Sequence, residues 1–489
     1  DPKKEHMTPV GIFIQDQWTL NRASINMGIR YDRYNGRVPA QSFAATNFIP
    51  QRSYGEIPSA ISFTDINPRL GVSYDLAGSG RTALKFSLGR YVETTLSGLV
   101  SRINPVSSAV LSANRTWNDA NGDFKPTCDL TNFNSNGECG QISNSLFGGT
   151  KANATTYDDA ITQGFGNRNY TWDMSAEVVH ELATGVSLTA GYYRNWAGNF
   201  RVDDNVEIAA SDFSPYCVTT PTDSRLPGGG GQELCGLYDI NPSAYGKSRT
   251  VVKDAGGFIG STSGITCGQQ RTSSGRAPSG GKNCGTSDFF GVSIDTRFGN
   301  GAQLGGGFDT GVTNINSCFV VDSPQNLLNC NTSIGTEAHN NFKAFGSFPL
   351  PYDISLSGSF RSVAGRPIDA DWRAPNSVIA GSLGRNLSKC GSKSFDACTA
   401  VVPIPLIPPY SKFLDRRNML DVRLSKAMNV GGATLTANFD VYNMLNGNQI
   451  LGVNERFGAS WLTPAAQQNN EVDAILAGRL IHVGGGIEF

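Results

Sequence analysis

The chain has 489 residues, with 40 Lys and Arg against 41 Asp and Glu, and 17% of its residues are charged. Soluble proteins carry about 25% charged residues, so this nearly neutral chain is atypical of a nucleic-acid binder and of a protein with a charged tail. Its 57 glycines exceed the usual share of about 7%. This composition favours turns and closely spaced strands and argues against a helical enzyme.

Two kinds of membrane or export segment are missing from the sequence. No stretch reaches the roughly 18 uninterrupted apolar residues of a membrane helix, and the longest apolar stretch, residues 401–408, contains three prolines. Residues 1–6 hold neither an apolar run nor an initiator Met, which leaves no signal peptide in this chain. We therefore expect either a mature protein or a piece of a longer one.

In chain order, apolar and polar residues alternate along thirteen segments. In one of them Leu70, Val72 and Tyr74 alternate with Gly71 and Ser73. A period of two residues predicts β-strands, because successive side chains point to opposite faces of a sheet. The predicted strands cover residues 10–18, 23–33, 66–76, 81–92, 169–182, 186–200, 286–298, 302–314, 337–348, 352–363, 415–428, 432–443 and 477–489.

The connections between these strands alternate between short and long. The short ones are tight turns such as residues 183–185 and 429–431. The long ones are predicted over residues 34–65, 93–168, 201–285, 315–336, 364–414 and 444–476. Tight turns at one end and long loops at the other are typical of an outer-membrane β-barrel, in which the long loops lie outside the cell.

The ten cysteines all fall inside long loops, as neighbours in sequence that predict one disulfide per pair. Such pairs form in an oxidising compartment. Zinc binding is the alternative to disulfides, but there is no Cys-x-x-Cys motif and no histidine at ligand spacing. A disulfide connectivity other than between sequence neighbours stays open. The expected pairs are Cys128 with Cys139, Cys217 with Cys235, Cys267 with Cys284, Cys318 with Cys330, and Cys390 with Cys398.

The length of the predicted strands favours a membrane barrel over a soluble β-sandwich. They run for about 10 to 13 residues, where soluble strands average about 5 to 6 and a tilted membrane strand needs about 9 to 11. In hydrocarbon only helices and closed barrels satisfy every backbone hydrogen bond. The apolar rows should therefore face lipid, and the charged rows between them, which include Arg30, Asp32, Asp421 and Arg423, should face the lumen.

The number of strands predicts that part of the barrel lies upstream. Read from the turns, the first strand starts outside and the last ends in the periplasm, which requires an odd number of strands. Single-chain bacterial barrels have an even number. If residues 10–18 were not a strand, twelve would remain and the number would be even. We expect the fragment not to insert stably alone, because it would leave two unpaired edges.

Four stretches resemble the carboxy-terminal part of a TonB-dependent outer-membrane receptor, in particular the Oar-like kind with a carboxypeptidase-regulatory-like amino-terminal domain. They are residues 16–32, residues 67–91 with PRLGVSYD and GRY, residues 439–446 with DVYNMLN, and residues 479–489. The terminal Phe489 is similar to the signal read by the barrel-assembly machinery.

The resemblance implies that residues 1–489 form one barrel domain, roughly the last thirteen strands of a 22-stranded barrel. In this family a plug fills the lumen and a short box contacts TonB, and neither is present in the sequence. The implied partners are outer-membrane lipid, the TonB complex through missing upstream segments, the barrel-assembly machinery and an imported ligand. The implied location is the outer membrane of a Gram-negative bacterium.

One loop segment has the beginning of a calcium-binding pattern. Asp119, Asn121 and Asp123 place oxygen side chains at alternate positions, with Asp129 close behind. The segment lacks the bidentate Glu of an EF-hand and has Phe124 where its Gly should stand. An Asx-rich turn is the competing interpretation, so structural calcium is a hypothesis and no other cofactor is expected.

Candidate ligand contacts lie in the long loops, where aromatic and guanidinium groups can stack and donate hydrogen bonds. These are Trp117, Tyr216, Tyr238, Trp372 and Arg373. No Ser-His-Asp set can be singled out with 4 His residues in the chain, and we predict that the protein is not an enzyme.

The sequence supports three hypotheses of different classes. The first is an importer of a bulky nutrient such as a siderophore, an oligosaccharide or a peptide. The second is a non-transporting Oar-like protein that acts in adhesion or surface organisation, and the third is a secreted soluble β-protein. Upstream plug and TonB-box sequences would favour the first hypothesis, and their absence the second.

Overall fold

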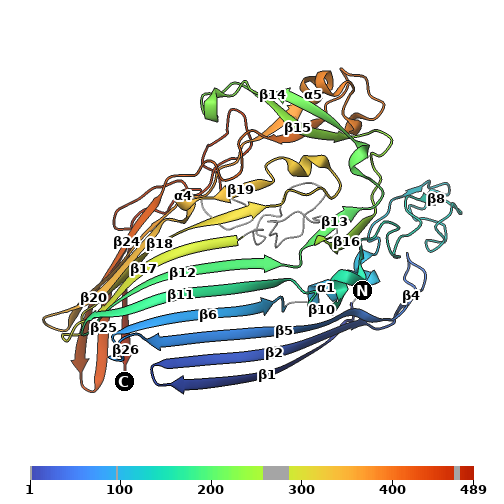
Figure 1. The fold of residues 1–489 in the computed structure, drawn as a ribbon. Coiled ribbons are helices and arrows are strands. Elements are labelled where there is room, and N and C mark those ends of the chain that lie inside the picture. The colour runs from blue at the N-terminus through green and yellow to red at the C-terminus, as the bar shows by residue number, and fades with distance from the viewer. Residues whose placement is uncertain (1–2, 95–96, 257–285, 467–473) are drawn as a thin grey trace.

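A computed structural model describes residues 3–94, 97–256, 286–466 and 474–489. Within these ranges thirteen long strands pair in chain order to form one antiparallel sheet. Figure 1 shows them as one curved wall from blue β1 to red β26. The strands are β1 (His6–Leu20), β2 (Ala23–Val38), β5 (Ile57–Asp75), β6 (Thr82–Val92), β11 (Tyr170–Ala183), β12 (Val186–Gly198), β17 (Thr286–Arg297), β18 (Gln303–Asn316), β20 (Asn341–Leu350), β21 (Ile354–Val363), β24 (Arg417–Val430), β25 (Ala433–Tyr442) and β26 (Leu480–Glu488).

All thirteen predicted strands are present, with two boundaries that differ clearly. The strand predicted from residue 337 starts at Asn341, because Thr336–His339 form the helical turn α4, closed by a 2.8 Å hydrogen bond from the Asn340 amide to the Thr336 carbonyl. The strand predicted from residue 66 already begins at Ile57, and the added length of β5 pairs with β2 as far as Val38. Residues 34–65 are therefore largely strand rather than one long loop.

The tight turns and the long loops lie at opposite ends of the wall, as predicted (Figure 1). The turn between β24 and β25 consists of Gly431 and Gly432, whose φ angles of 58° and 95° suit a two-residue hairpin that needs positive φ at both positions. The amino terminus lies at the loop end and the carboxy terminus at the turn end. None of the helices in the described ranges is long and apolar enough to span a membrane.

The register aligns apolar side chains into continuous rows on one face of the sheet. One such row crosses the wall through Ile25, Val72, Phe86, Ala176 and Tyr192, each directly opposite the next. Many large side chains on this face, such as Ile29, Leu70 and Phe290, are exposed, because no other part of the described chain covers them. An apolar surface of this extent is the surface that a barrel presents to lipid.

The outward face also carries one charged pair that the alternation pattern did not reveal. Arg194 lies 3.6 Å from Asp288, and the Tyr192 hydroxyl donates to the same carboxylate. The next outward row toward the loops holds Trp172 and Trp196, stacked with ring centres 6.0 Å apart. Paired charges beside stacked tryptophans fit the interfacial level of a membrane, where aromatic girdles lie.

The sheet is open in the described residues, because β1 and β26 form its two edges and do not pair with each other. The remaining elements belong to the long connections. Most of their strands build small sheets of two or three strands, whereas β10 (Gln163–Phe165) and β19 (Asn331–Ile334) pair with β5 and β18 of the wall. The elements used below are α1 (Ser97–Ile103), β9 (Thr156–Tyr157), α2 (Asp159–Thr162), β10 (Gln163–Phe165), β13 (Arg201–Asn205), β14 (Phe213–Thr219), β15 (Glu233–Ile240), β16 (Thr250–Asp254), β22 (Asp371–Pro375), α5 (Asn376–Leu383) and β23 (Val401–Pro405). Shorter strands are β3 (Gln41–Phe43), β4 (Arg52–Tyr54), β7 (Arg115–Trp117), β8 (Cys139–Ile142) and β19 (Asn331–Ile334).

Candidate functional site

The inner face of the wall carries charged side chains that pair with one another. Arg30 and Asp32 on β2 approach to 2.9 Å. Near the opposite edge Asp440 on β25 lies 2.5 Å from Arg423 on β24 and 3.0 Å from Nδ1 of His482 on β26. Charged side chains at both edges of the sheet, in the middle of long strands, suit a hydrated lumen and not lipid.

A cavity of about 470 Å³ opens on the inner face of the first four strands of the sheet. Its lining includes Arg30, Arg69 and Arg90 together with Phe13 and Tyr91. The Arg69 guanidinium lies 4.9 Å from the centre of the Tyr91 ring, a cation–π contact. Three guanidinium groups beside aromatic rings can hold anionic or aromatic groups. The cavity could not be predicted from the sequence, because its lining comes from four strands that meet only in the folded sheet.

The connection between β6 and β11 folds onto the inner face of the wall at its loop end. Leu99 and Val100 of α1 pack against Val38, Ile61 and Phe63 of β2 and β5. All five side chains are at least nine-tenths buried. The side chains of β2 alternate, and Val38 is on the same face as Arg30, so this apolar core lies inside the wall. The loop therefore narrows the mouth of the lumen.

A buried ion pair fastens the same connection to the wall. Arg168, just before β11, donates from Nε to Oδ2 of Asp65 at 2.6 Å, and neither side chain is exposed. The guanidinium also lies 4.3 Å from the centre of the Tyr34 ring and donates to the Glu93 carbonyl at 2.9 Å. A second guanidinium, that of Arg90, lies 3.4 Å from Asp65. The sequence did not reveal this cluster.

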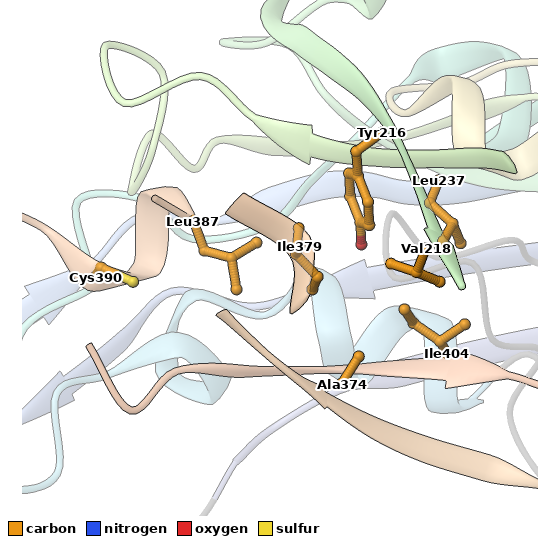
Figure 2. Packing of buried hydrophobic residues seen from close by; sticks show 8 residues of the cluster. All are labelled: Tyr216, Val218, Leu237, Ala374, Ile379, Leu387, Cys390 and Ile404. Atoms are coloured by element: carbon orange, nitrogen blue, oxygen red, sulfur yellow. The ribbon is translucent and has the colours of Figure 1, made fainter. Parts of the chain in front are cut away.

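The outer loops pack into a cap with its own apolar core. In Figure 2 Tyr216 and Leu237 of the β14–β15 hairpin face Ile379 of α5 and Ile404 of β23. These residues come from two connections that lie far apart in sequence. The complete buried cluster comprises Tyr216, Val218, Leu237, Ala374, Ile379, Leu387, Cys390 and Ile404.

Polar contacts join the same loops around that core. Arg385 donates to Asp239 at 2.6 Å, which links the loop after β21 to β15. Arg225 donates to the carbonyls of Trp461 at 2.9 Å and Gly458 at 3.0 Å, which brings in the loop after β25. Because the loops hold one another, the cap presents a defined outer surface.

The five predicted ligand contacts do not meet at one site. Tyr216 is 3% exposed, and its burial in the cap core removes it from the candidates, which corrects that prediction. Trp372 packs partly buried against the same core, and the amide of Tyr238 donates to Gln325 Oε1 at 3.1 Å. Arg373 is exposed on β22, and Trp117 is 43% exposed in another loop. Ligand binding by these four residues stays a prediction.

Burial also shifts the pKa of one side chain in the cap core. Removal from water raises the pKa of Tyr216 to about 12. Its hydroxyl has no hydrogen-bond partner among the residues that the structure describes. The side chain therefore contributes through packing and not through its hydroxyl.

The predicted calcium residues are only partly brought together. The carboxylates of Asp119 and Asp123 gather with that of Glu138, all within 4.8 Å of one another. Asp129 is not in this group, since its Oδ1 accepts from the amide and the hydroxyl of Thr131. Glu138 could not be found from the sequence, because it lies in a turn further along the loop and reaches the two aspartates only in the folded loop.

Backbone amides already satisfy much of this cluster. The Glu138 carboxylate accepts from the amides of Thr127, Ala120 and Asn121, and the Thr127 amide in particular lowers the pKa of Glu138. The side-chain oxygen Oδ1 of Asn121 accepts from the Asp123 amide at 2.9 Å. These contacts are those of an Asx-rich turn. Calcium binding stays a prediction.

Four of the five predicted disulfides are formed, which confirms the pairing of sequence neighbours at these positions. The fifth predicted pair, Cys267 with Cys284, lies outside the described residues. The bonds observed are Cys128–Cys139, Cys217–Cys235, Cys318–Cys330 and Cys390–Cys398.

Comparison with known proteins supports the membrane interpretation of the wall. Residues 2–240 match the family model of an outer membrane beta barrel domain. No curated protein is similar enough to the chain to count as a match.

Several solved structures are similar over nearly the whole chain. The outer membrane transporter YddB from Escherichia coli is 10% identical, over 99% of this chain and 54% of that chain, with a TM-score of 0.44. The ferric-catecholate import receptor Fiu from E. coli is 11% identical over 99% and 45%, with a TM-score of 0.42. The siderophore receptor PiuA from Acinetobacter baumannii is 9% identical over 99% and 43%, with a TM-score of 0.42. The chain spans about half of the length of these structures.

The family match, the two different faces of the wall and the disulfide-bonded loops all indicate an outer-membrane β-barrel. They confirm the expected fold class, an antiparallel outer-membrane β-sheet wall with long disulfide-bonded loops, and the expected location. This chain is therefore an outer-membrane protein of Gram-negative bacteria, with an outer membrane beta barrel domain matched over residues 2–240 and the same wall continuing to β26.

Proposed function

We propose that this chain forms the wall and outer loops of a TonB-dependent receptor that imports a bulky nutrient across the outer membrane. The observation that carries the proposal is the division of the wall into an apolar outer face and a charged inner face. A lumen lined by paired charges can surround a plug or a passing ligand. The cavity beside Arg69 and Tyr91 offers guanidinium and aromatic groups on that path.

The resemblance to TonB-dependent receptors implies an energy source for import. In TonB-dependent receptors a plug fills the lumen and a short box contacts TonB, which couples import to the proton gradient of the inner membrane. Both segments would come from upstream of this chain. A siderophore, an oligosaccharide and a peptide are the ligand classes that a wide lumen would admit.

Uptake in whole cells tests this function. A strain that lacks the complete gene should fail to accumulate one of a panel of labelled siderophores, oligosaccharides or peptides. An uncoupler of the proton gradient should abolish that uptake in the wild type. Uptake that persists after the uncoupler is added would exclude energy-coupled import. If the complete gene encodes neither a plug nor a TonB box, energy-coupled import is excluded as well.

A second candidate, adhesion or surface organisation, is favoured by the apolar surface of the outer loops. Leu111 and Phe124 are 86% and 85% exposed in the connection between β6 and β11. Exposed apolar groups on a structured loop can serve as contacts for another surface. Loss of cell–cell cohesion in the deletion strain, with uptake of every labelled nutrient unchanged, would support this function instead.

A further inference from the structure

Three outer connections meet at one small sheet beside the mouth of the wall. β13 and β16 pair within the connection that follows β12, and β16 pairs in parallel with β9 of the connection between β6 and β11. The connection after β18 docks against this sheet through Phe319, which is 5% exposed and packs against Phe200 and Val202. We name this meeting point the loop junction.

Two carboxyl groups lie next to each other inside the loop junction. Asp322, from the connection after β18, is fully buried, and its Oδ1 accepts from the Asn205 amide at 3.0 Å. Its other oxygen, Oδ2, finds no donor within the described part of the chain. Asp204 of β13, itself 8% exposed, lies beside it. Asp322 binds the amide of Asn205, the residue that follows Asp204, so two ionised carboxylates here would repel each other, and protonation of one of them removes that repulsion.

We propose that Asp204 and Asp322 hold one proton between them, and that gain or loss of this proton tightens or loosens the loop junction. No import activity is assumed in this proposal. It rests on the burial of both carboxyl groups and on the oxygen of Asp322 that has no donor. The pair joins β13 to the connection after β18, so its charge state acts on the contact between two loops.

The other charged groups at the loop junction decide which carboxyl keeps the proton. Lys253 of β16 lies 2.7 Å from Asp204 and stabilises the ionised form of that residue. Asp203, also on β13, adds negative charge, and β9 contributes Tyr157, which is neutral at physiological pH. The proton therefore belongs to Asp322, which has no cation beside it within the described residues and has only one amide donor.

The sign of the pH effect follows from this assignment. Burial, aided by the charge of Asp204, raises the pKa of Asp322 to about 6 from 3.8. A carboxyl group with a higher pKa when docked binds its proton more tightly in the docked state. Docking is therefore strongest below pH 4 and weakens as the pH rises to about 6. A difference of about two pKa units corresponds to roughly a 100-fold change in the docking equilibrium.

Hydrogen exchange of the complete gene product in outer-membrane vesicles tests the proposal. Rates are corrected for the intrinsic pH dependence of exchange, and a chelator is present so that no cation replaces the proton. Between pH 4 and pH 8 the peptides over residues 201–205 and 317–330 should lose protection by roughly 100-fold. Wall peptides of β17 serve as the internal reference and should not change over the same range.

Two variants and one control complete the experiment. Asp322→Asn keeps an oxygen acceptor for the Asn205 amide but cannot titrate, so protection should become independent of pH. Asp204→Asn should flatten the pH profile as well, because the new side-chain amide can donate to ionised Asp322. This variant replaces Asp322→Asn in the experiment if Asp322→Asn does not assemble. Asp396→Asn alters an exposed loop carboxyl and should keep the wild-type profile. A flat wild-type profile, or a wild-type profile in both junction variants, would overturn the proposal.

Discussion

Arg168 and Asp65 form an ion pair in which neither side chain reaches solvent, with 2.6 Å between Nε and Oδ2. The pair joins the loop that narrows the lumen to the inner face of β5. A charge at such a place depends on its partner, because burial without compensation costs several kcal/mol. The ion pair therefore fixes the position of this loop relative to β5.

Replacing Arg168 by Met should release the loop from the wall. The change leaves the Asp65 carboxylate buried with less compensation, at a cost of about 3–5 kcal/mol. Protease cleavage near α1 and hydrogen exchange of that helix should both rise. Arg37→Met is the matched control, because Arg37 and Glu56 form an exposed pair worth less than about 1 kcal/mol. Equal effects of the two substitutions would contradict the role of the buried pair.

Gly36→Val should push α1 away from the wall. A Cβ at Gly36 would lie 2.6 Å from Cγ2 of Val100 and 2.7 Å from Cγ1 of Ile61. Overpacking of this kind costs about 1–3 kcal/mol. Adding Val100→Ala should recover part of the loss in thermal stability. Gly55→Ala is the control, because no atom lies within 4 Å of its added Cβ, and a comparable loss there would refute the packing argument.

Arginine placed at neighbouring positions of β6 should separate the two faces of the wall. Phe86 belongs to an apolar row, and Ser87 points the other way and contacts Ser175 at 2.8 Å. Phe86→Arg should lower the free energy of unfolding in a bilayer by about 2–4 kcal/mol, whereas Ser87→Arg should be tolerated. Val422→Arg on β24 repeats the test near the other edge. Similar losses on both faces would argue against a lipid-facing row.

Removing the Cys217–Cys235 disulfide should loosen the cap. The bond closes 18 residues of chain, and its loss by double substitution with Ser should cost about 3 kcal/mol. The Cys390–Cys398 bond closes 8 residues, and its loss should cost less by the same entropy argument. Protease resistance of the outer loops measures both effects. The reverse order would show that native contacts, and not chain entropy, dominate.

Tyr216→Phe should leave the stability of the cap unchanged or slightly raised. Its buried hydroxyl has no hydrogen-bond partner in the described ranges, so its removal exposes no unsatisfied group. Tyr216→Ala should cost about 3–5 kcal/mol through the cavity that it leaves. Thermal unfolding followed by loop proteolysis distinguishes the two variants. A large loss for the Phe variant would mean that the hydroxyl makes a contact after all.

The wall could be predicted from the sequence because its determinants are local. Leu70, Val72 and Tyr74 reveal a strand and its two faces within five residues, and tight turns separate one strand from the next. The prediction was wrong where this alternation is weak, and Thr336–His339 form a helical turn instead. Disulfides between sequence neighbours could be predicted for the same reason.

The loops could not be predicted, because their contacts join distant parts of the chain. Nothing local to Tyr216 distinguishes a ligand contact from a core residue, since its neighbours Ile379 and Ile404 belong to another connection. Likewise Asp65 meets Arg168 across 103 positions.

The sequence by itself determined a two-faced wall, its strand order and the compartment in which its loops are oxidised, because alternation, turn chemistry and cysteine spacing act over short distances. Only the tertiary structure decided which loop lines the lumen, which aromatic residues form the cap core and which carboxyl groups share a buried site. Those outcomes depend on burial and charge compensation between segments that meet only once the wall has folded.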